Sequence, residues 1–530
     1  MADAVAAVDV GSTSARAGIF DPAGRMLGSA SVPFSVNRPA ADHAEHDSGE
    51  IWAAVAKATH EALSESGAAP AAVKGLAFDA TCSLVMLDSG GRPVTVSTTG
   101  EDRWNVVMWA DHRATREATE ITGTRHRALD YVGGTMSPEM ELPKLLWLKR
   151  NLPRAWSRYG LAFDLADFLT WRATGVPAAS ACTVTCKWTY LNHQKTAWQV
   201  DLLDQIGLSD MLSRLRLPQR AMQLGMTVGG LTAPAAADLG LPSGIPVGVG
   251  LIDAHAGGLG VLAGASGEEL NQRLAVIAGT STCHMAISPE PRAVPGIWGP
   301  YFGAMLPGLW LNEGGQSAAG ALLDHILEWH VEGRKLGANP HERLGQYIMQ
   351  KRAEAGPGYA RDVLVLPDFH GNRSPLAVAS LRGVIHGLDL DTSLDSLARL
   401  YHAAVVGLGY GTRHIIDELN RHGYRISRLN LTGGHSKSAL LMQLYADATG
   451  CEIALPREAD GVLLGTSLAA ATAAGLYPDL QAAGRAMAHQ SRVVKPDPEA
   501  GDVHTRGYAA FRLMIEQRKD VTTVLARGSH

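Results

Sequence analysis

The sequence predicts an α/β protein made of two related domains. The chain has 530 residues, which is too long for one hydrophobic core, so two or more domains are expected. A strand, a glycine, three hydroxyl-bearing residues and a second strand follow one another twice, as DVGSTSARAGIF and as IAGTSTCHMAIS. This repetition, once in each half, indicates two domains that each present a hairpin tip to a shared cleft. Chance similarity between two such turns is the alternative.

Acidic residues stand at the ends of several expected strands. Each of them follows an apolar run of strand type; they are Asp9, Asp79, Asp111 and Asp253. Open α/β proteins bind their ligands at the carboxyl ends of sheet strands. Four such strand ends therefore favour a site assembled along one edge of a sheet.

The composition is that of a globular protein, with 46% hydrophobic and 19% charged residues. The net charge of −5 gives no electrostatic reason to expect nucleic acid or a membrane surface as a partner. The first residues, MADAVAAVDV, lack the basic region of a signal peptide, and no apolar run reaches the roughly 18 residues of a membrane span. We therefore expect neither a secretion signal nor a membrane segment.

The five cysteines are scattered along the chain, at Cys82, Cys182, Cys186, Cys283 and Cys451. The closest two, Cys182 and Cys186, lack the second pair that a zinc site needs. A reducing, cytoplasmic compartment is expected from this usage. Residues 527–530 resemble the remnant of an expression tag and are set aside.

The first half alternates strands and helices. Strands are expected at residues 5–10, 15–20 and 25–32, with a type I turn at residues 21–24. Asp47 and Glu50 have the spacing of a capping box, and the apolar residues after them fall on one face of a helix. Further strands are expected at residues 74–78, 85–87 and 106–110, and helices at residues 140–151 and 163–173.

The tip of the first hairpin, Gly11-Ser12-Thr13-Ser14, has the composition of a phosphate site. Backbone N–H groups and hydroxyls converge at such a tip and suit an anion. It is not a Walker loop, because no Gly-Lys-Ser/Thr follows. An ordinary polar hairpin is the alternative.

The stretch VGVGLIDAHAGG, residues 247–258, joins the two halves. An apolar run of strand type ends at Asp253, and small residues follow. Asp253 is interpreted either as the cap of a helix that starts at Ala254 or as a functional carboxylate held at the lip of a sheet. Its place between the two hairpin tips favours the functional role. The domain boundary is expected near residues 257–267.

The second half repeats the alternation. A strand at residues 274–278 is followed by Gly279, Thr280 and Ser281 and by another strand. A short buried strand at residues 429–431 leads into Gly433 and Gly434 and a helix at residues 438–449, which lets backbone approach a ligand closely. A long helix is expected at residues 393–421, and a helix of small residues able to pack tightly at residues 461–474.

Together these motifs resemble the FGGY carbohydrate kinases, over about residues 4–515. The residues that carry the resemblance are DVGSTSAR at 9–16, Asp253, Gly279-Thr280-Ser281, Gly433-Gly434 with Gln443, Ala446, Asp447 and Gly450, and the stretches 140–153 and 164–175. The resemblance implies two actin-like (ribonuclease-H-like) domains with a cleft between them. Residues 1–260 would bind sugar and residues 261–526 would bind ATP.

The resemblance also implies the site. Asp253 would accept the proton of the sugar hydroxyl, as a general base, and Asp9 would hold Mg2+, through water. The residues implied for the nucleotide are Gly11, Ser12, Thr13, Arg16, Gly279, Thr280, Gly315, Gly433, Gly434 and Ser438. The residues implied for the sugar are Ala80, Thr81, Asp111, Lys187, Asp253 and Glu313, with Trp109 and His112 nearby. The alternatives are a solvated charge for Lys187, a salt bridge alone for Arg16 and simple packing for Trp109.

The run Thr81-Cys82-Ser83-Leu84-Val85 is similar to the D-ribulose kinase branch of the family, and Ala80, Lys187, Asp253 and Glu313 to the ketose contacts of ribulokinases. The expected activity is the phosphorylation of D-ribulose to D-ribulose 5-phosphate. Kinases of L-ribulose, xylulose or ribitol, and a non-catalytic sugar or nucleotide sensor, are the alternatives. Ser438 departs from the asparagine that glycerol kinases carry near adenine. A homodimer is also considered.

Overall fold

The computed structural model describes residues 3–458 and 460–526. The predicted tag remnant at 527–530 lies outside them. The chain divides into two compact units. The first lies within Met1–Leu270, Ile287–Asn312 and Asp460–His489, and the second within Asn271–Ala286, Glu313–Ala459 and Gln490–His530. The predicted domains, residues 1–260 and 261–526, are continuous in sequence, whereas each compact unit combines several segments. The predicted division after residue 260 stays a prediction.

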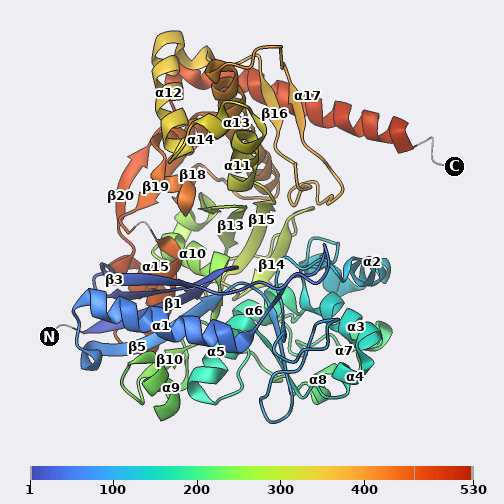
Figure 1. Ribbon diagram of the computed structural model, residues 1–530, viewed down its shortest axis with the longest axis vertical. Helices are drawn as coiled ribbons and strands as arrows, with labels where there is room; N and C mark the ends of the chain where they lie inside the picture. Colours follow the sequence, from blue (N-terminus) through green and yellow to red (C-terminus); the bar gives the residue numbers. More distant parts are fainter. Residues whose placement is uncertain (1–2, 459, 527–530) are drawn as a thin grey trace. The chain divides into compact units, whose positions relative to one another are not determined.

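The first unit is built on a sheet with the strand order β3-β2-β1-β5-β10-β9, in which β11 also pairs with β5 (Figure 1). β1 is antiparallel to β2, and β2 to β3, whereas β1, β5 and β10 run parallel. The bounds are β1 Ala4–Val10, β2 Ser14–Phe20, β3 Met26–Pro33, β5 Val73–Ala80, β9 Thr227–Gly230, β10 Pro246–Gly248 and β11 Leu251–Ile252. The predicted strand before Asp253 is therefore two short strands, interrupted at Val249 and Gly250.

Helices cover both faces of this sheet. Alternate residues of β1 join one hydrophobic cluster with α1 (Ser48–Ser66), α5 (Leu165–Thr174) and α9 (Ala233–Leu239). Because side chains alternate along a strand, the other residues of β1 face the opposite side, where α15 (Gly461–Ala473) packs on β1 and β5.

The predicted capping box of α1 is half formed. The side chain of Asp47 accepts hydrogen bonds from the backbone N–H groups of Gly49 and Glu50, as an N-cap does. The carboxylate of Glu50 does not close the box, because it accepts instead from the backbone N–H and the hydroxyl of Ser35, at 2.9 and 2.5 Å.

Glycines bring α10 (Asp253–Leu262) against α15. A Cβ at Gly465 would lie 1.8 Å from the carbonyl oxygen of Ala256, and a Cβ at Gly260 would lie 2.1 Å from that of Gly461. No side chain fits at either position, so the two helices meet through their backbones. The predicted tight packing of the helix at 461–474 is confirmed. The predicted boundary region at 257–267 is instead largely the body of α10.

A second, four-stranded sheet of this unit has the order β4-β7-β6-β8, with bounds β4 Glu45–His46, β6 Leu84–Leu87, β7 Val106–Val107 and β8 Leu161–Asp164. Two predicted elements are corrected here. The strand predicted at 106–110 ends at Val107. The helix predicted at 163–173 begins at Leu165, because Leu161–Asp164 pair with β6.

The remaining helices of the first unit are α2 Thr115–Gly123, α3 Glu141–Asn151, α4 Pro153–Trp156, α6 Ala181–Lys187, α7 Val200–Gln205, α8 Met211–Arg214 and α16 Leu480–Met487. The helix predicted at 140–151 is confirmed to within one residue. Within residues 3–458 and 460–526, no helix has the length and hydrophobicity needed to cross a bilayer.

A second seven-stranded sheet repeats this design, with the order β14-β15-β13-β12-β18-β19-β20. β12 is antiparallel to β13 and parallel to β18, and β18 is parallel to β19. These four strands, in the order β13, β12, β18 and β19, have the same relative directions as β2, β1, β5 and β10 of the first sheet. The bounds are β12 Arg273–Ala278, β13 Thr282–Ser288, β14 Trp298–Phe302, β15 Trp310–Gln316, β18 Arg428–Thr432, β19 Glu452–Pro456 and β20 Gln490–Val494. A separate hairpin joins β16 Leu364–Leu366 to β17 Val384–His386.

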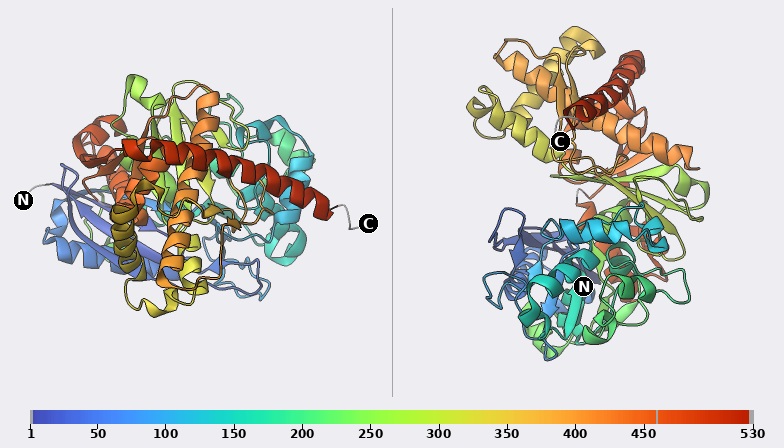
Figure 2. Two further views of the ribbon diagram at one scale, coloured as in Figure 1. Left: turned by 90° about the horizontal axis from the view of Figure 1, so that it is seen from above. Right: turned by 90° about the vertical axis from the view of Figure 1, so that its right-hand side faces the viewer.

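The helices of the second unit are α11 Gly320–Trp329, α12 Pro340–Ala355, α13 Leu394–Arg421, α14 Ala439–Thr449 and α17 Gly501–Ala526. α17 is the long helix that ends the described chain (Figure 2). The two predicted hairpin tips close alike: the N–H of Gly11 donates to the carbonyl of Ser14 at 3.0 Å, and that of Gly279 donates to Ser281 at 2.9 Å. The predicted repetition of one design is confirmed.

Candidate functional site

Three of the four predicted strand-end acids lie at one edge of the first sheet. Asp9 and Asp79 are register partners on the parallel strands β1 and β5. On the other side of β5, Leu251 and Ile252 of β11 pair with Asp79 and Ala80, so the chain reaches Asp253 at the same edge. The prediction of an acidic sheet edge is confirmed for these three residues.

Asp9 and Arg16 form the charged part of this edge. The Arg16 Nε donates to Asp9 Oδ2 at 2.6 Å, and its Nη1 contacts Asp460 Oδ2 at 2.5 Å. Burial lowers the pKa of Arg16, but the carboxylates of Asp9 and Asp460 outweigh it and raise that pKa above its usual value. The salt-bridge alternative for Arg16 is thus present in the structure, and its phosphate role stays a prediction.

Asp79 lies between the other two acids and is fully buried. Burial and the charge of Asp9 raise the pKa of Asp79 well above its usual value. The hydroxyl of Thr466 donates to Asp79 Oδ2.

Asp253 is the first residue of α10 rather than its N-cap. Ile252 takes the N-cap position, and no side chain caps the helix. The Asp253 Oδ1 accepts from the N–H of Ala254 at 2.7 Å, which orients the carboxylate. The predicted helix start at Ala254 is therefore one residue late. A negative charge in the first turn is favoured by the helix dipole.

A buried thiol–imidazole pair ties Asp253 to α6. Cys182 of α6 accepts at Sγ from the N–H of Ile252 at 3.4 Å, and its Sγ lies 3.1 Å from His255 Nδ1. Both side chains are fully buried. Helix α6 also ends at Lys187, so one rigid element supports Lys187 and the start of α10. Sequence reasoning missed this pairing, because its residues are 73 positions apart.

Lys187 is buried, with only 3% of its surface exposed. Its ammonium lies 4.5 Å from the ring centre of Trp298, a cation–π distance. The alternative of a solvated charge is therefore wrong. Nearby, Glu141 and Lys144 are fully buried and lie 3.4 Å apart. Burial raises the pKa of Glu141 to about 7, although the charges of Lys144 and Lys187 oppose that rise.

The prediction that Asp111 lies with the other strand ends is wrong. It follows β7 in the separate four-stranded sheet and is fully buried. Its Oδ2 accepts from the N–H of Ala44 at 2.6 Å and from Arg113 Nη2 at 2.7 Å, and its Oδ1 accepts from Arg113 Nε at 2.8 Å. Arg113 Nη2 also contacts Glu45 Oε1 at 2.9 Å. This buried ion triad gives Asp111 a structural role, and its contact with a sugar stays a prediction.

The predicted residues around Ala80 form a tight turn beside the first hairpin. The N–H of Thr81 donates to the carbonyl of Val10 at 2.9 Å, and the hydroxyls of Thr81 and Ser83 lie 3.0 Å apart. Trp109 does more than pack: its Nε1 donates to Ser12 Oγ at 2.9 Å and its N–H donates to Ser83 Oγ at 3.0 Å. Trp109 thus links the hairpin tip to this turn.

Two further residues, His112 and Glu313, were predicted to bind the sugar. His112 is 3.8 Å from Glu139, whose hydrogen bond raises the pKa of His112. Glu313 is buried on β15 and belongs to the second unit, whereas the other sugar candidates belong to the first.

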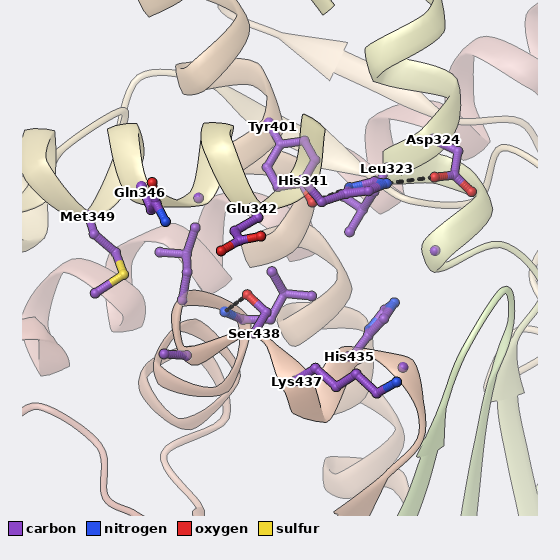
Figure 3. Close-up of a pocket in the computed structure, with 16 residues that line it drawn as sticks. Leu323, Asp324, His341, Glu342, Gln346, Met349, Tyr401, His435, Lys437 and Ser438 are labelled. Atoms are coloured by element: carbon purple, nitrogen blue, oxygen red, sulfur yellow. Dashed lines mark hydrogen bonds and ion pairs between the residues drawn. The ribbon is translucent and has the colours of Figure 1, made fainter. Parts of the chain in front are cut away.

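The second unit contains a cavity of about 500 Å³ that includes predicted nucleotide residues (Figure 3). Gly434 and Ser438 line it. Gly433, just before them, has φ 98°, and a Cβ there would lie 2.5 Å from the carbonyl of Ala278, so only glycine fits. The Ser438 hydroxyl caps α14 by accepting from the N–H of Leu441 at 3.3 Å.

Gly315 is not part of this cavity. It lies on β15, where a Cβ would meet Arg373 and the carbonyl of Thr282, each at 2.9 Å. Gly320, which sequence reasoning missed, lines the cavity instead. Its N–H donates to the carbonyl of Gly279 at 3.0 Å, which docks the start of α11 on the second hairpin tip. In the sequence, Gly320 is only a single glycine after β15, and it is less conspicuous than the Gly314-Gly315 pair within that strand.

Polar side chains that the sequence did not reveal complete the cavity wall. Asp324 Oδ1 lies 2.8 Å from His341 Nε2, and His341 Nδ1 lies 2.9 Å from the Tyr401 hydroxyl (Figure 3). Glu342 and His435 also line the cavity. Carboxylates, imidazoles and glycines together suit a polar ligand with both donors and acceptors.

No group of three or more His, Cys, Asp or Glu residues in the described ranges is arranged to hold a metal ion. Mg2+ in phosphoryl-transfer sites commonly uses one or two carboxylates together with substrate phosphates and water. Asp9, the register partner of Asp79 on the neighbouring strand, is a carboxylate that fits that donor set.

The fold and the site define a two-unit α/β protein with an acidic sheet edge in one unit and a glycine-walled cavity in the other. Residues 4–260 match the N-terminal domain, and residues 274–474 the C-terminal domain, of the FGGY family of carbohydrate kinases. The chain belongs to this family.

Relatives agree with this membership, and a solved structure agrees with the fold. The chain is 45% identical to an FGGY carbohydrate kinase domain-containing protein of Danio rerio, over 98% of each chain. It is 36% identical to a D-ribulokinase of Saccharomyces cerevisiae, over 88% of this chain and 71% of that protein. A crystal structure of a xylulose kinase from Brucella ovis superimposes with a TM-score of 0.81 at 21% identity, covering 98% of this chain and all of that one. The predicted two-domain α/β fold is confirmed.

Proposed function

We propose that the protein is an ATP-dependent kinase of a ketopentose, with D-ribulose as substrate and D-ribulose 5-phosphate as product. The observation that carries the proposal is the shared support of Asp253 and Lys187 by α6, which holds a carboxylate and a buried ammonium in one rigid frame. The 36% identity to a D-ribulokinase supports the choice of sugar.

The chemistry follows from these groups. Asp253 takes the proton of the reacting sugar hydroxyl, whose oxygen forms a bond to the γ-phosphorus of ATP while the bond to the β–γ bridging oxygen breaks and ADP leaves. Lys187 donates hydrogen bonds to the ketose oxygens. The hairpin tips at Gly11–Thr13 and Gly279–Ser281 bind phosphate through N–H groups and hydroxyls. Mg2+ held by Asp9 would neutralise phosphate charge.

The cavity of the second unit is the proposed ATP site. Gly320 and Gly434 let the nucleotide approach the backbone, and Ser438 stands where the base-contacting asparagine of glycerol kinases is expected.

A panel of acceptors tests the proposed substrate. ADP release is measured by a coupled assay with D-ribulose, L-ribulose, D-xylulose and ribitol, at saturating ATP. We expect the highest kcat/KM with D-ribulose. A higher value with another member would reassign the substrate to that sugar. No sugar-dependent ADP with any of the four would favour the sensor alternative.

Asp9→Asn tests the proposed Mg2+ ligand. Loss of the carboxylate is expected to raise the Mg2+ concentration for half-maximal rate by about 10-fold or more, the usual cost of disturbing a metal site. Because the change also breaks a contact of Arg16, Asp460→Asn serves as the matched control, which breaks the other contact of Arg16 and leaves Asp9 in place. Equal metal dependence in both variants would make Asp9 a structural partner of Arg16.

The proposed compartment is the cytoplasm, in keeping with five free cysteines. The homodimer stays a prediction.

A further inference from the structure

His435 is a buried imidazole in the wall of the cavity of the second unit. It lies on the single turn η6 (Gly434–Lys437), directly after the Gly433-Gly434 pair, and only 7% of its surface is exposed. Neither ring nitrogen has a hydrogen-bond partner within residues 3–458 and 460–526. A buried polar group without a partner is costly, so its persistence indicates a partner that arrives with a ligand.

The ring is neutral at physiological pH. Burial lowers the pKa of His435 to about 4; the charge of His341 lowers it further, and that of Asp324 opposes the change. A neutral imidazole offers one N–H donor and one acceptor nitrogen. His435 can therefore donate to a ligand oxygen without bringing a permanent charge into the cavity.

The position of the ring points to one end of the cavity. A Cβ at Gly320 would lie 3.4 Å from His435 Nε2 and 2.8 Å from the carbonyl of Gly279. His435 therefore lies beside the second hairpin tip, which carries Gly279, Thr280 and Ser281. A Cβ at Gly434 would meet no atom within 4 Å, so there is open space beside the residue that precedes His435, and both residues line the cavity.

Figure 3 shows His435 and Lys437 together, apart from Gln346 and Met349 across the cavity. The His435 end therefore combines an imidazole, an ammonium, glycines and hydroxyls, which are the groups that recognise phosphate. The other end is lined by a thioether and an amide, which suit a base.

We propose that His435 is a nucleotide-binding residue whose N–H donates to a phosphate oxygen of the bound nucleoside triphosphate and so fixes the polyphosphate at the second hairpin tip. The inference rests on the proposed assignment of this cavity to ATP. His435 would supply an imidazole N–H donor, which neither Gly433-Gly434 nor the second hairpin tip provides.

Calorimetric titration of the full-length protein with ATP, ADP and adenosine tests the proposal. His435→Leu removes both nitrogens and keeps an apolar side chain of similar bulk. It is expected to weaken ATP and ADP binding by about 10-fold or more, the worth of a hydrogen bond to a charged group, and to leave adenosine affinity unchanged. His435→Gln and His435→Asn place an amide N–H near Nε2 and Nδ1 respectively, and the one that matches the donor should restore ATP affinity.

His330→Leu is the matched control, because His330 ends α11 and does not line the cavity. It should leave all three affinities unchanged. Unaltered ATP affinity in His435→Leu, or an equal loss for adenosine, would overturn the phosphate contact. A wild-type protein that binds none of the three ligands would overturn the assignment of the cavity itself, which is a separate failure.

Discussion

Replacing Asp253 by asparagine is expected to lower kcat by about 10²–10⁴ while ketose and ATP still bind. The amide keeps the size of the side chain and an oxygen that can accept from the N–H of Ala254, so α10 keeps its start. It cannot accept the hydroxyl proton, and the expected loss is the usual contribution of a general base. Steady-state kinetics and direct titration with the sugar together separate the loss of turnover from a loss of binding.

Asp130→Asn is the matched control, because Asp130 is an exposed acid of the first unit outside the acidic sheet edge. This variant should turn over as the wild type does. Turnover within a few-fold of wild type in Asp253→Asn would mean that another group accepts the proton. Loss of sugar binding in parallel with kcat would make Asp253 a binding residue instead.

Replacing Asp111 by asparagine is expected to destabilise the protein by about 3–5 kcal/mol and to leave the KM for the ketose unchanged. Asp111 and Arg113 are both fully buried, and removal of one member of a buried ion pair leaves the other charge uncompensated. Glu45 still contacts Arg113, which favours the lower end of that range. Thermal and denaturant unfolding measure the loss.

An exposed pair provides the comparison. Asp102 and Arg158 make a bidentate contact at 2.6 and 3.0 Å on the surface, and Asp102→Asn should cost less than about 1 kcal/mol. A raised ketose KM in Asp111→Asn, with stability equal to that of Asp102→Asn, would show that Asp111 contacts the sugar after all.

The sequence was sufficient to predict the repeated design and most of the acidic edge. The hairpin tips were visible because glycine and hydroxyl residues interrupt two apolar strands in the same way. Asp9, Asp79 and Asp253 were placed together correctly, since they end strands that proved to be parallel neighbours. Asp111 ends a similar apolar run, but local pattern does not reveal which sheet a strand joins, and β7 pairs with β4 and β6.

The missed residues depend on contacts between distant segments. Lys187 lies against Trp298, which is 111 positions away in the chain, and Cys182 accepts a hydrogen bond from Ile252, the residue before Asp253. Gly320 and His435 lie in the cavity wall because the fold brings η6 next to the second hairpin tip. Such pairings are set by the tertiary fold, so periodicity and spacing do not predict them.

The most direct test of the central claim is to follow the reaction of the wild-type protein with D-ribulose, ATP and Mg2+ by phosphorus NMR. We expect a phosphate monoester resonance of a pentulose phosphate that grows in step with ADP, one for one, with little inorganic phosphate. ADP accompanied only by inorganic phosphate, or no consumption of ATP, would contradict it.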